Sequence, residues 1–257
     1  MAKWTTLPQA GQYGFSLERL RKHWGRLHQG DAEALPKDAA VLEAWALFHG
    51  GEFQKAAQAG IKAGGAGLAV ANKATSVYAI YLEKKEGSRL ALYQEVAQRA
   101  CSQLVDDPDN ASAHYWQAFA LGRYSHGISV AKALAQGLGG KVKAGLETVI
   151  ALQPRHADAH LALGAFHAEV IDKVGSLIGN MTYGAKKTAG IKLFQQGLAL
   201  NPNSALAMVE YANALVVFEG DQKLVEATQW YEKAADFKPL DAAEWLDVEM
   251  ARVELED

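Results

Sequence analysis

Four prolines from residue 108 onward accompany a repeated pattern of small residues, and this repeat constrains the fold more than any other feature. Pro108, Pro154 and Pro202 are each followed by alanine three residues later and by alanine again five residues later. Ten residues after each of them the side chain is small once more, as alanine, glycine and alanine in turn. Apolar stretches of helical periodicity flank these prolines and Pro239, so the pattern predicts helices that meet at the prolines.

Large side chains recur at a second position of the repeat. Eight residues before Pro154, Pro202 and Pro239, the chain has Leu146, Phe194 and Tyr231. Small residues let two helix backbones approach closely, and a larger side chain of the neighbouring helix can fill the gap that remains. Each repeat is therefore predicted to be a pair of packed helices. Because no segment alternates β-branched and polar residues between turn signals, we expect an all-α protein.

Repeated helix pairs with small central residues and a terminal proline resemble the tetratricopeptide repeat, whose unit is about 34 residues long. The segment from Ala205 to Pro239 matches best, with Tyr211-Ala212 in the family's Leu-Gly place and Gly220-Asp221 at the turn between its helices. The resemblance covers residues 108–239. It implies a right-handed solenoid of helical repeats with lengthened helix pairs.

The organisation expected from this resemblance is a single all-α domain over residues 1–257. Residues 1–107 form its degenerate helical N-terminal part, in which Ser16 and Asp38 are predicted to cap helices. Residues 108–239 contain three repeat units, two of them with insertions. Residues 240–257 are predicted to form a capping helix, since a helical array needs a solvated end.

Two insertions are the most individual feature of the chain. The spacing between successive prolines of the repeat is 46, 48 and 37 residues, so the first two units carry 12 and 14 residues more than the consensus. The segments that contain the extra residues, 124–144 and 170–192, are rich in lysine, amphipathic and interrupted by glycine. Four interpretations remain open: lengthened helices packed on a neighbour, a lid over a groove, an oligomer contact, or a membrane-surface patch.

Lengthened helix pairs between repeat units also occur in two groups of repeat proteins. These are the regulator of microtubule dynamics family and the tetratricopeptide proteins associated with TRAP transporters, and the chain resembles both in architecture. The transporter-associated proteins carry a leader that we do not find here, so a role in transport is not expected.

The first helix of each tetratricopeptide unit lines an inner groove, and projecting that register onto this chain gives a mostly apolar set of candidate binding residues. They are Tyr115, Phe119, Arg123, Leu161, Leu206, Val209, Asn213 and Val216. The resemblance implies a non-enzymatic binding module or scaffold that holds a protein or peptide partner in this groove. The alternative is a small-molecule or lipid carrier whose groove is closed by the insertions. In a third interpretation, the insertions or the N-terminal helices cover the same positions, which then belong to the ordinary core.

The sequence gives only weak signals for a catalytic site or a metal-binding site. His156 and His160 are four residues apart and could share a helix face, but His160 occupies the repeat position that Met208 fills in another unit. A position that accepts methionine is a packing position, so we expect structural histidines and no metal site. No Ser/His/Asp or Cys/His arrangement stands out. We expect no cofactor and no catalytic residue.

Charge is divided unevenly along the chain. Residues 210–257 hold 13 acidic and four basic side chains, a net charge of −9, and the remaining 209 residues carry +6. The split favours a partner with an acidic surface or association between copies of the chain. With a net charge of −3, nucleic-acid binding is not expected. One cysteine, no apolar run long enough to span a membrane and no signal-peptide pattern predict a cytoplasmic protein without membrane contact.

Overall fold

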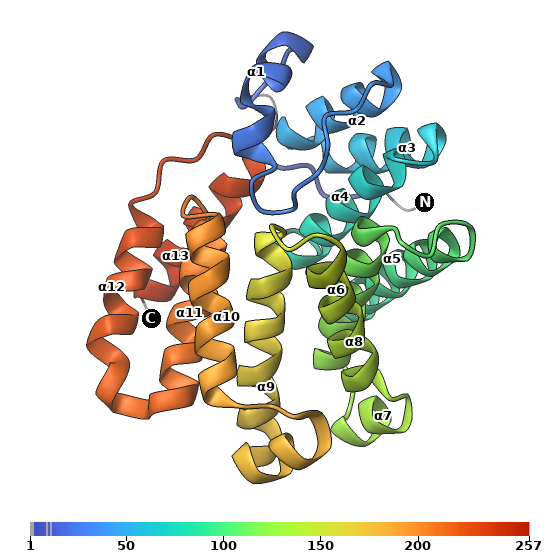
Figure 1. Cartoon of the computed structure of the whole chain (residues 1–257). Helices are drawn as coiled ribbons and strands as arrows, with labels where there is room; N and C mark the ends of the chain where they lie inside the picture. The colour runs from blue at the N-terminus through green and yellow to red at the C-terminus, as the bar shows by residue number, and fades with distance from the viewer. Residues whose placement is uncertain (1–2, 9, 11, 257) are drawn as a thin grey trace. The chain divides into compact units, whose positions relative to one another are not determined.

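The structure is a computed structural model that describes residues 3–8, 10 and 12–256, and all the regular elements in these residues are helices (Figure 1). The all-α prediction is therefore confirmed. In chain order the helices are α1 (Leu17–Leu27), α2 (Ala39–His49), α3 (Phe53–Ala63), α4 (Gly67–Tyr81), α5 (Glu86–Asp106), α6 (Ala111–His126), α7 (Val130–Ala135), α8 (Leu138–Leu152), α9 (Ala157–Tyr183), α10 (Lys187–Leu200), α11 (Ala205–Glu219), the 3-10 turn η1 (Gly220–Lys223), α12 (Leu224–Ala235) and α13 (Ala242–Glu256).

The prolines of the repeat lie between helices, as predicted. Pro108 separates α5 from α6, Pro154 separates α8 from α9, Pro202 separates α10 from α11, and Pro239 lies between α12 and α13. A helix that follows such a turn starts with backbone N–H groups that have no acceptor within the helix. At α6 and α11 the side chains of Asn110 and Ser204 accept a hydrogen bond from the third residue that follows them.

The predicted N-terminal caps are also present. Ser16 Oγ accepts a hydrogen bond of 3.1 Å from the Arg19 N–H at the start of α1. Asp38 Oδ1 accepts one of 2.8 Å from the Ala40 N–H at the start of α2. Each cap satisfies a backbone donor that the helix leaves free, which fixes where the helix begins.

The chain divides into two compact units, and neither is a continuous stretch. The first unit contains the described residues up to His28, together with Glu33–Thr148 and Leu240–Ala243. The second contains Gln29–Ala32, Val149–Pro239 and the chain from Glu244 onward. The division falls inside α8 and α13, whereas the sequence predicted parts that meet at residues 107 and 239. The single-domain organisation remains a prediction.

In the first unit, α2 to α6 pack in succession, and α2 contacts α4 while α4 contacts α6. Contacts between alternate helices are typical of stacked helical pairs. The backbones of α3 and α4 approach closely, since a Cβ on Gly60 would lie 2.4 Å from the Gly67 carbonyl oxygen and one on Gly67 would lie 2.6 Å from the Gly60 carbonyl oxygen. Only glycine fits at these two positions.

The second unit has the same arrangement, with α9 packed on α10, α11 packed on α12, and α9 in contact with α11. Here the predicted pairing of small and large positions is confirmed. A Cβ on Gly164 would lie 2.8 Å from the ring of Phe194, which is fully buried. Phe194 belongs to an apolar cluster with Leu161, Ala207 and further residues of α9, α10 and α11.

The two insertions are helical. Within the first lies the short helix α7, and the second contains the end of α9 and the turn that follows it. The backbone of Gly175 is not helical, with φ 80° and ψ 159°, so α9 is kinked there and a separate helical segment continues to Tyr183. Gly184 then ends the helix in the left-handed conformation, which glycine adopts without steric cost.

Candidate functional site

In the first unit, three residues of the predicted groove lie close together on α6. The Tyr115 and Phe119 rings are 5.9 Å apart, and the Arg123 guanidinium lies 5.4 Å from the centre of the Phe119 ring. Trp116, which was not among the predicted residues, is 5.5 Å from Phe119 and completes an aromatic cluster. Tyr115 is buried, while Phe119 and Arg123 are half-buried.

In the second unit, two of the predicted groove residues belong to helix interfaces. Leu161 packs against α10, where a Cβ on Gly197 would lie 2.5 Å from Leu161 Cγ. Val209 lies in an apolar cluster with Ala235 and Val248, and so packs on α12 and α13. These two side chains are buried against α10, α12 and α13, whereas the third interpretation of the sequence expected the insertions or the N-terminal helices to cover them.

The other predicted residues of the second unit are more accessible. Leu206 and Val216 are half-buried on α11, and Asn213 is exposed. The Tyr231 hydroxyl of α12 donates a hydrogen bond to Asn213 Oδ1, and burial raises the pKa of that hydroxyl. A fixed amide beside two partly exposed apolar side chains can hold a polar group of a ligand. The use of these residues as a binding groove remains a prediction.

The segment that follows α1 contacts the beginning of the helices that would line this groove. In the first unit, Ser112 Oγ of α6 donates a hydrogen bond of 2.6 Å to a Glu33 carboxylate oxygen. In the second unit, the Asp158 N–H of α9 donates to the Gly30 carbonyl at 3.0 Å. Residues 30 and 33 thus contact the first turn of α9 and of α6, respectively.

A shallow hollow of about 630 Å³ is lined by residues of η1 and α12. Trp230 lines it together with Val225 and Lys233, whose ammonium group is 4.8 Å from the centre of the Trp230 ring. The hollow was not predicted from the sequence, because its residues fall outside the groove register of the repeat.

The histidines of the repeat make local structural bonds. The His160 imidazole donates from Nε2 to the Pro154 carbonyl at 3.0 Å, and His114 donates in the same way to the Pro108 carbonyl at 2.8 Å. A carbonyl oxygen can only accept, so Nε2 carries the proton in both residues. His156 caps α9, accepting a hydrogen bond of 3.2 Å at Nδ1 from the Ala159 N–H. These bonds support the structural role that the sequence predicted.

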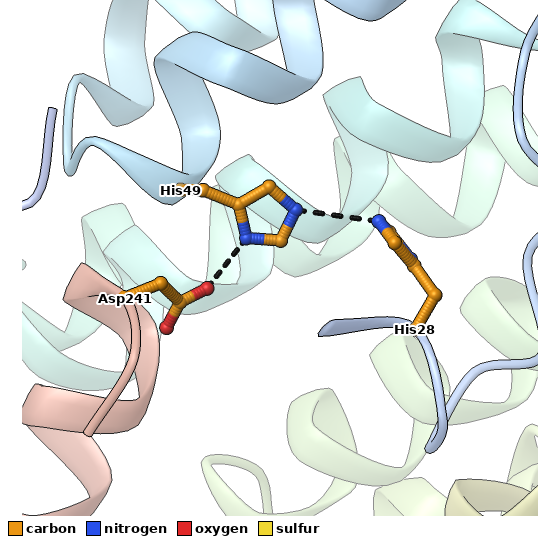
Figure 2. Close-up of polar contacts among 3 residues, drawn as sticks. All are labelled: His28, His49 and Asp241. Atoms are coloured by element: carbon orange, nitrogen blue, oxygen red, sulfur yellow. Dashed lines mark hydrogen bonds and ion pairs between the residues drawn. The ribbon is translucent and has the colours of Figure 1, made fainter. Parts of the chain in front are cut away.

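A buried chain of polar side chains connects three distant parts of the first unit (Figure 2). His49, at the end of α2, lies between Asp241 and His28: its Nδ1 is 2.5 Å from Asp241 Oδ2 and its Nε2 is 3.3 Å from His28 Nε2. The three residues are 1%, 3% and 3% exposed, in the order His49, Asp241 and His28. The Asp241 carboxylate accepts from Nδ1–H of His49, so neutral His49 can accept at Nε2 from His28.

Aromatic rings enclose this chain. Trp24 stacks on His28 with ring centres 3.8 Å apart, and Trp45 stacks on His49 with ring centres 5.7 Å apart. An aspartate–histidine pair is a familiar catalytic element, but catalysis requires that a substrate reach the outer nitrogen of the imidazole. Here that nitrogen faces another buried histidine. The arrangement holds the end of α1 and the start of α13 to α2.

Sequence reasoning missed this chain of side chains. His28 and His49 are 21 residues apart, and His49 and Asp241 are 192 residues apart. No local spacing in the sequence connects them.

Comparison with proteins of known structure supports the helical-repeat fold. The crystal structure of a thermophilic TPR protein from Thermus thermophilus is similar to this chain, with a TM-score of 0.59 and 15% sequence identity, over 83% of this chain and 97% of that protein. The chain has a tetratricopeptide-like fold. No family model matches the sequence, and no curated protein matches it significantly. The two architectural resemblances drawn from the insertions remain predictions.

None of the helices in the described part of the chain is both long and apolar enough to cross a membrane.

Proposed function

We propose that this protein is a non-enzymatic binding module that holds a protein or peptide partner on α11 of the second unit. The fold supports the general class, because stacked helical pairs of this kind commonly present extended surfaces to other proteins. The observation that carries the proposal is the face of α11 on which Leu206, Asn213 and Val216 remain accessible, while the neighbouring Val209 is fixed in the core.

The chemistry of this face favours an extended or helical peptide. Two apolar side chains separated by about three helical turns provide anchoring contacts, and the amide of Asn213 between them provides a directional hydrogen bond. We further propose that the partner is acidic. Lys132 and Lys141 are exposed in the first insertion, which belongs to the first unit, and an acidic part of the partner would be attracted to them.

The proposal is tested with peptides selected from a random displayed library against the whole protein. Affinity for a selected peptide is then measured by fluorescence anisotropy for wild type, for Val216→Glu and for Asn213→Arg. We expect each substitution to weaken binding about tenfold or more, because Val216→Glu buries an unpaired charge against the partner and Asn213→Arg removes the amide that bonds to it. Asn213 is exposed, so Asn213→Arg tests the site even where Val216→Glu perturbs folding.

A matched control and a charge comparison complete the experiment. Val225→Glu alters an apolar residue of α12 that is 74% exposed and should leave the affinity unchanged. Equal affinities for all the variants would exclude α11 as the site.

Native mass spectrometry that detects a bound small molecule in the purified protein would favour the carrier alternative instead. An acidic partner predicts selected peptides rich in Asp and Glu, whose affinity falls as salt rises.

A further inference from the structure

The helical segment after the kink in α9 shows a pattern of burial that is the reverse of an ordinary surface helix. Gly179 is buried, whereas Leu177 is 74% exposed, Ile178 57% and Met181 79%. Leu177, Ile178 and Met181 follow one another at intervals of one and three residues, which places them on one face of the helix. The segment therefore turns its glycine toward the protein and its large apolar side chains outward.

The orientation of this segment is fixed by packing on its inner side. A Cβ on Gly179 would lie 2.9 Å from Val170 Cγ1, so the segment folds closely back on the first part of α9. Tyr183 packs edge-on against Phe166 with ring centres 6.0 Å apart. Ala185, which is 1% exposed, donates its N–H to the Gly179 carbonyl at 3.1 Å. These inward contacts hold the apolar face outward.

Positive charge accompanies the apolar face. Residues 170–192 contain four lysines and one acidic residue, Asp172. Lys187 pairs with Glu219 at 2.5 Å, while Lys173 and Lys186 are accessible immediately before the kink and after the helix end. Three protruding apolar side chains between two accessible lysines are typical of a surface that enters the headgroup region of an anionic membrane.

We propose that the segment 176–183 docks onto an anionic lipid surface, with Leu177, Ile178 and Met181 entering the interface and Lys173 and Lys186 binding lipid headgroups. Side chains that are 57–79% exposed stand clear of the protein and form no walls for a partner to fill. A deformable lipid interface accommodates such protrusions without a shaped pocket, and for this reason it suits the surface better than a second folded protein.

The test places an environment-sensitive fluorophore on the segment itself. In a Cys101→Ser background, which removes the single cysteine, Met181→Cys is labelled with a nitrobenzoxadiazole dye. The control is Val225→Cys with the same label, because Val225 is 74% exposed on α12. With phosphatidylcholine–phosphatidylserine vesicles, we expect the dye at position 181 to shift to the blue and brighten, and the dye at position 225 to remain unchanged. Pure phosphatidylcholine vesicles should give a much smaller response.

Two sets of variants separate the contribution of the apolar side chains to membrane binding from that of the lysines. Replacing Leu177, Ile178 and Met181 by serine, or reversing Lys173 and Lys186 to glutamate, should lower the amount of protein that sediments with anionic vesicles about tenfold or more. Reversing Lys62 and Lys238, two other accessible lysines, should have a small effect. The four altered lysines and three apolar residues are all accessible enough for the variants to keep the wild-type circular dichroism spectrum.

Three results would overturn the proposal. The first is the absence of a response at position 181 with anionic vesicles. The second is an equal response when polyglutamate replaces the vesicles, which would indicate an acidic polypeptide. The third is a response that grows with protein concentration alone, which would indicate a second copy of the chain. The peptide experiment on α11 does not involve these residues, so either proposal can fail without the other.

Discussion

At the residue scale, the repeat assigns Ala159 and Ala207 to positions where helices touch. Both are buried, at 0% and 1% exposure, and Ala207 lies in the apolar cluster around Phe194. We predict that Ala159→Leu lowers the free energy of unfolding by about 1–3 kcal/mol, because the added methylenes overpack the interface. Ala199→Leu, at an exposed position of α10, should change it by less than about 0.5 kcal/mol. Thermal denaturation followed by circular dichroism measures both, and a neutral Ala159→Leu would show that the repeat register is wrong.

Asp241 provides a second residue-scale prediction. Asp241→Leu leaves the Nδ1–H of buried His49 without its acceptor, which should lower the free energy of unfolding by about 1–3 kcal/mol. Asp241→Asn keeps an oxygen that can accept the same bond, and it should cost less. Guanidinium denaturation of the two variants compares them directly. If Leu and Asn were equally tolerated, the hydrogen bond to His49 would contribute little to stability.

At the scale of elements, the glycine pair between α3 and α4 is the most demanding contact of the first unit. Gly60→Ala would place a methyl group 2.4 Å from the Gly67 carbonyl oxygen and 2.9 Å from the Ala71 nitrogen, both of them backbone atoms that cannot rotate away. We predict a loss of about 1–3 kcal/mol in the free energy of unfolding, since the two helices must separate. This outweighs the gain of up to about 1 kcal/mol that alanine normally brings in a helix.

The matched control is Gly87→Ala in α5, where a new Cβ has no neighbour within 4 Å. This substitution should stabilise the protein slightly, because alanine has less backbone freedom to lose on folding. Chemical denaturation of the two variants should therefore give changes of opposite sign. Two changes of the same sign would contradict the close backbone approach of α3 and α4.

The elements that could be predicted from the sequence are those with a local or repeated signal. Prolines between helices, the caps Ser16 and Asp38, and the pairing of Gly164 with Phe194 all depend on residue types at fixed spacings. The kink at Gly175 was not predicted, because a glycine within a helical pattern usually continues the helix. The repeat spacing was a poorer guide to the groove residues. Leu161 and Val209 fit the spacing, but Leu161 packs against Gly197 and Val209 packs against Val248, so both lie in helix interfaces. Which face a helix buries depends on residues far away in the chain.

At the scale of the whole molecule, the division of charge leads to a prediction about self-association. The acidic C-terminal region and the lysines of the first insertion carry opposite charges and can attract one another in different copies. We predict that sedimentation velocity detects a small closed oligomer at low salt. It should dissociate near 1 M salt, where the screening length falls to about 3 Å.

Lys132→Glu with Lys141→Glu should give a monomer at low salt. Lys143 of the same insertion is left unchanged, because it already pairs with Glu147 at 2.9 Å. Lys62→Glu with Lys84→Glu applies the same change of charge at other exposed positions and should preserve the oligomer. A wild-type monomer at low salt would exclude self-association and leave an external partner as the reason for the charge division.

The discontinuity of the two units has a consequence for biosynthesis. His49 is synthesised 192 residues before Asp241, its buried hydrogen-bond acceptor, and the first unit is complete only when Leu240–Ala243 has been added. Gln29–Ala32 is synthesised early but belongs to the second unit. Gln29 cannot form its hydrogen bonds with Leu200 and Asn203 until those residues have been synthesised. Neither unit can therefore finish folding while the ribosome is still translating the middle of the message. The nascent chain therefore holds incomplete helical stacks until residues 240–243, and the residues of α13 that follow them, have been synthesised.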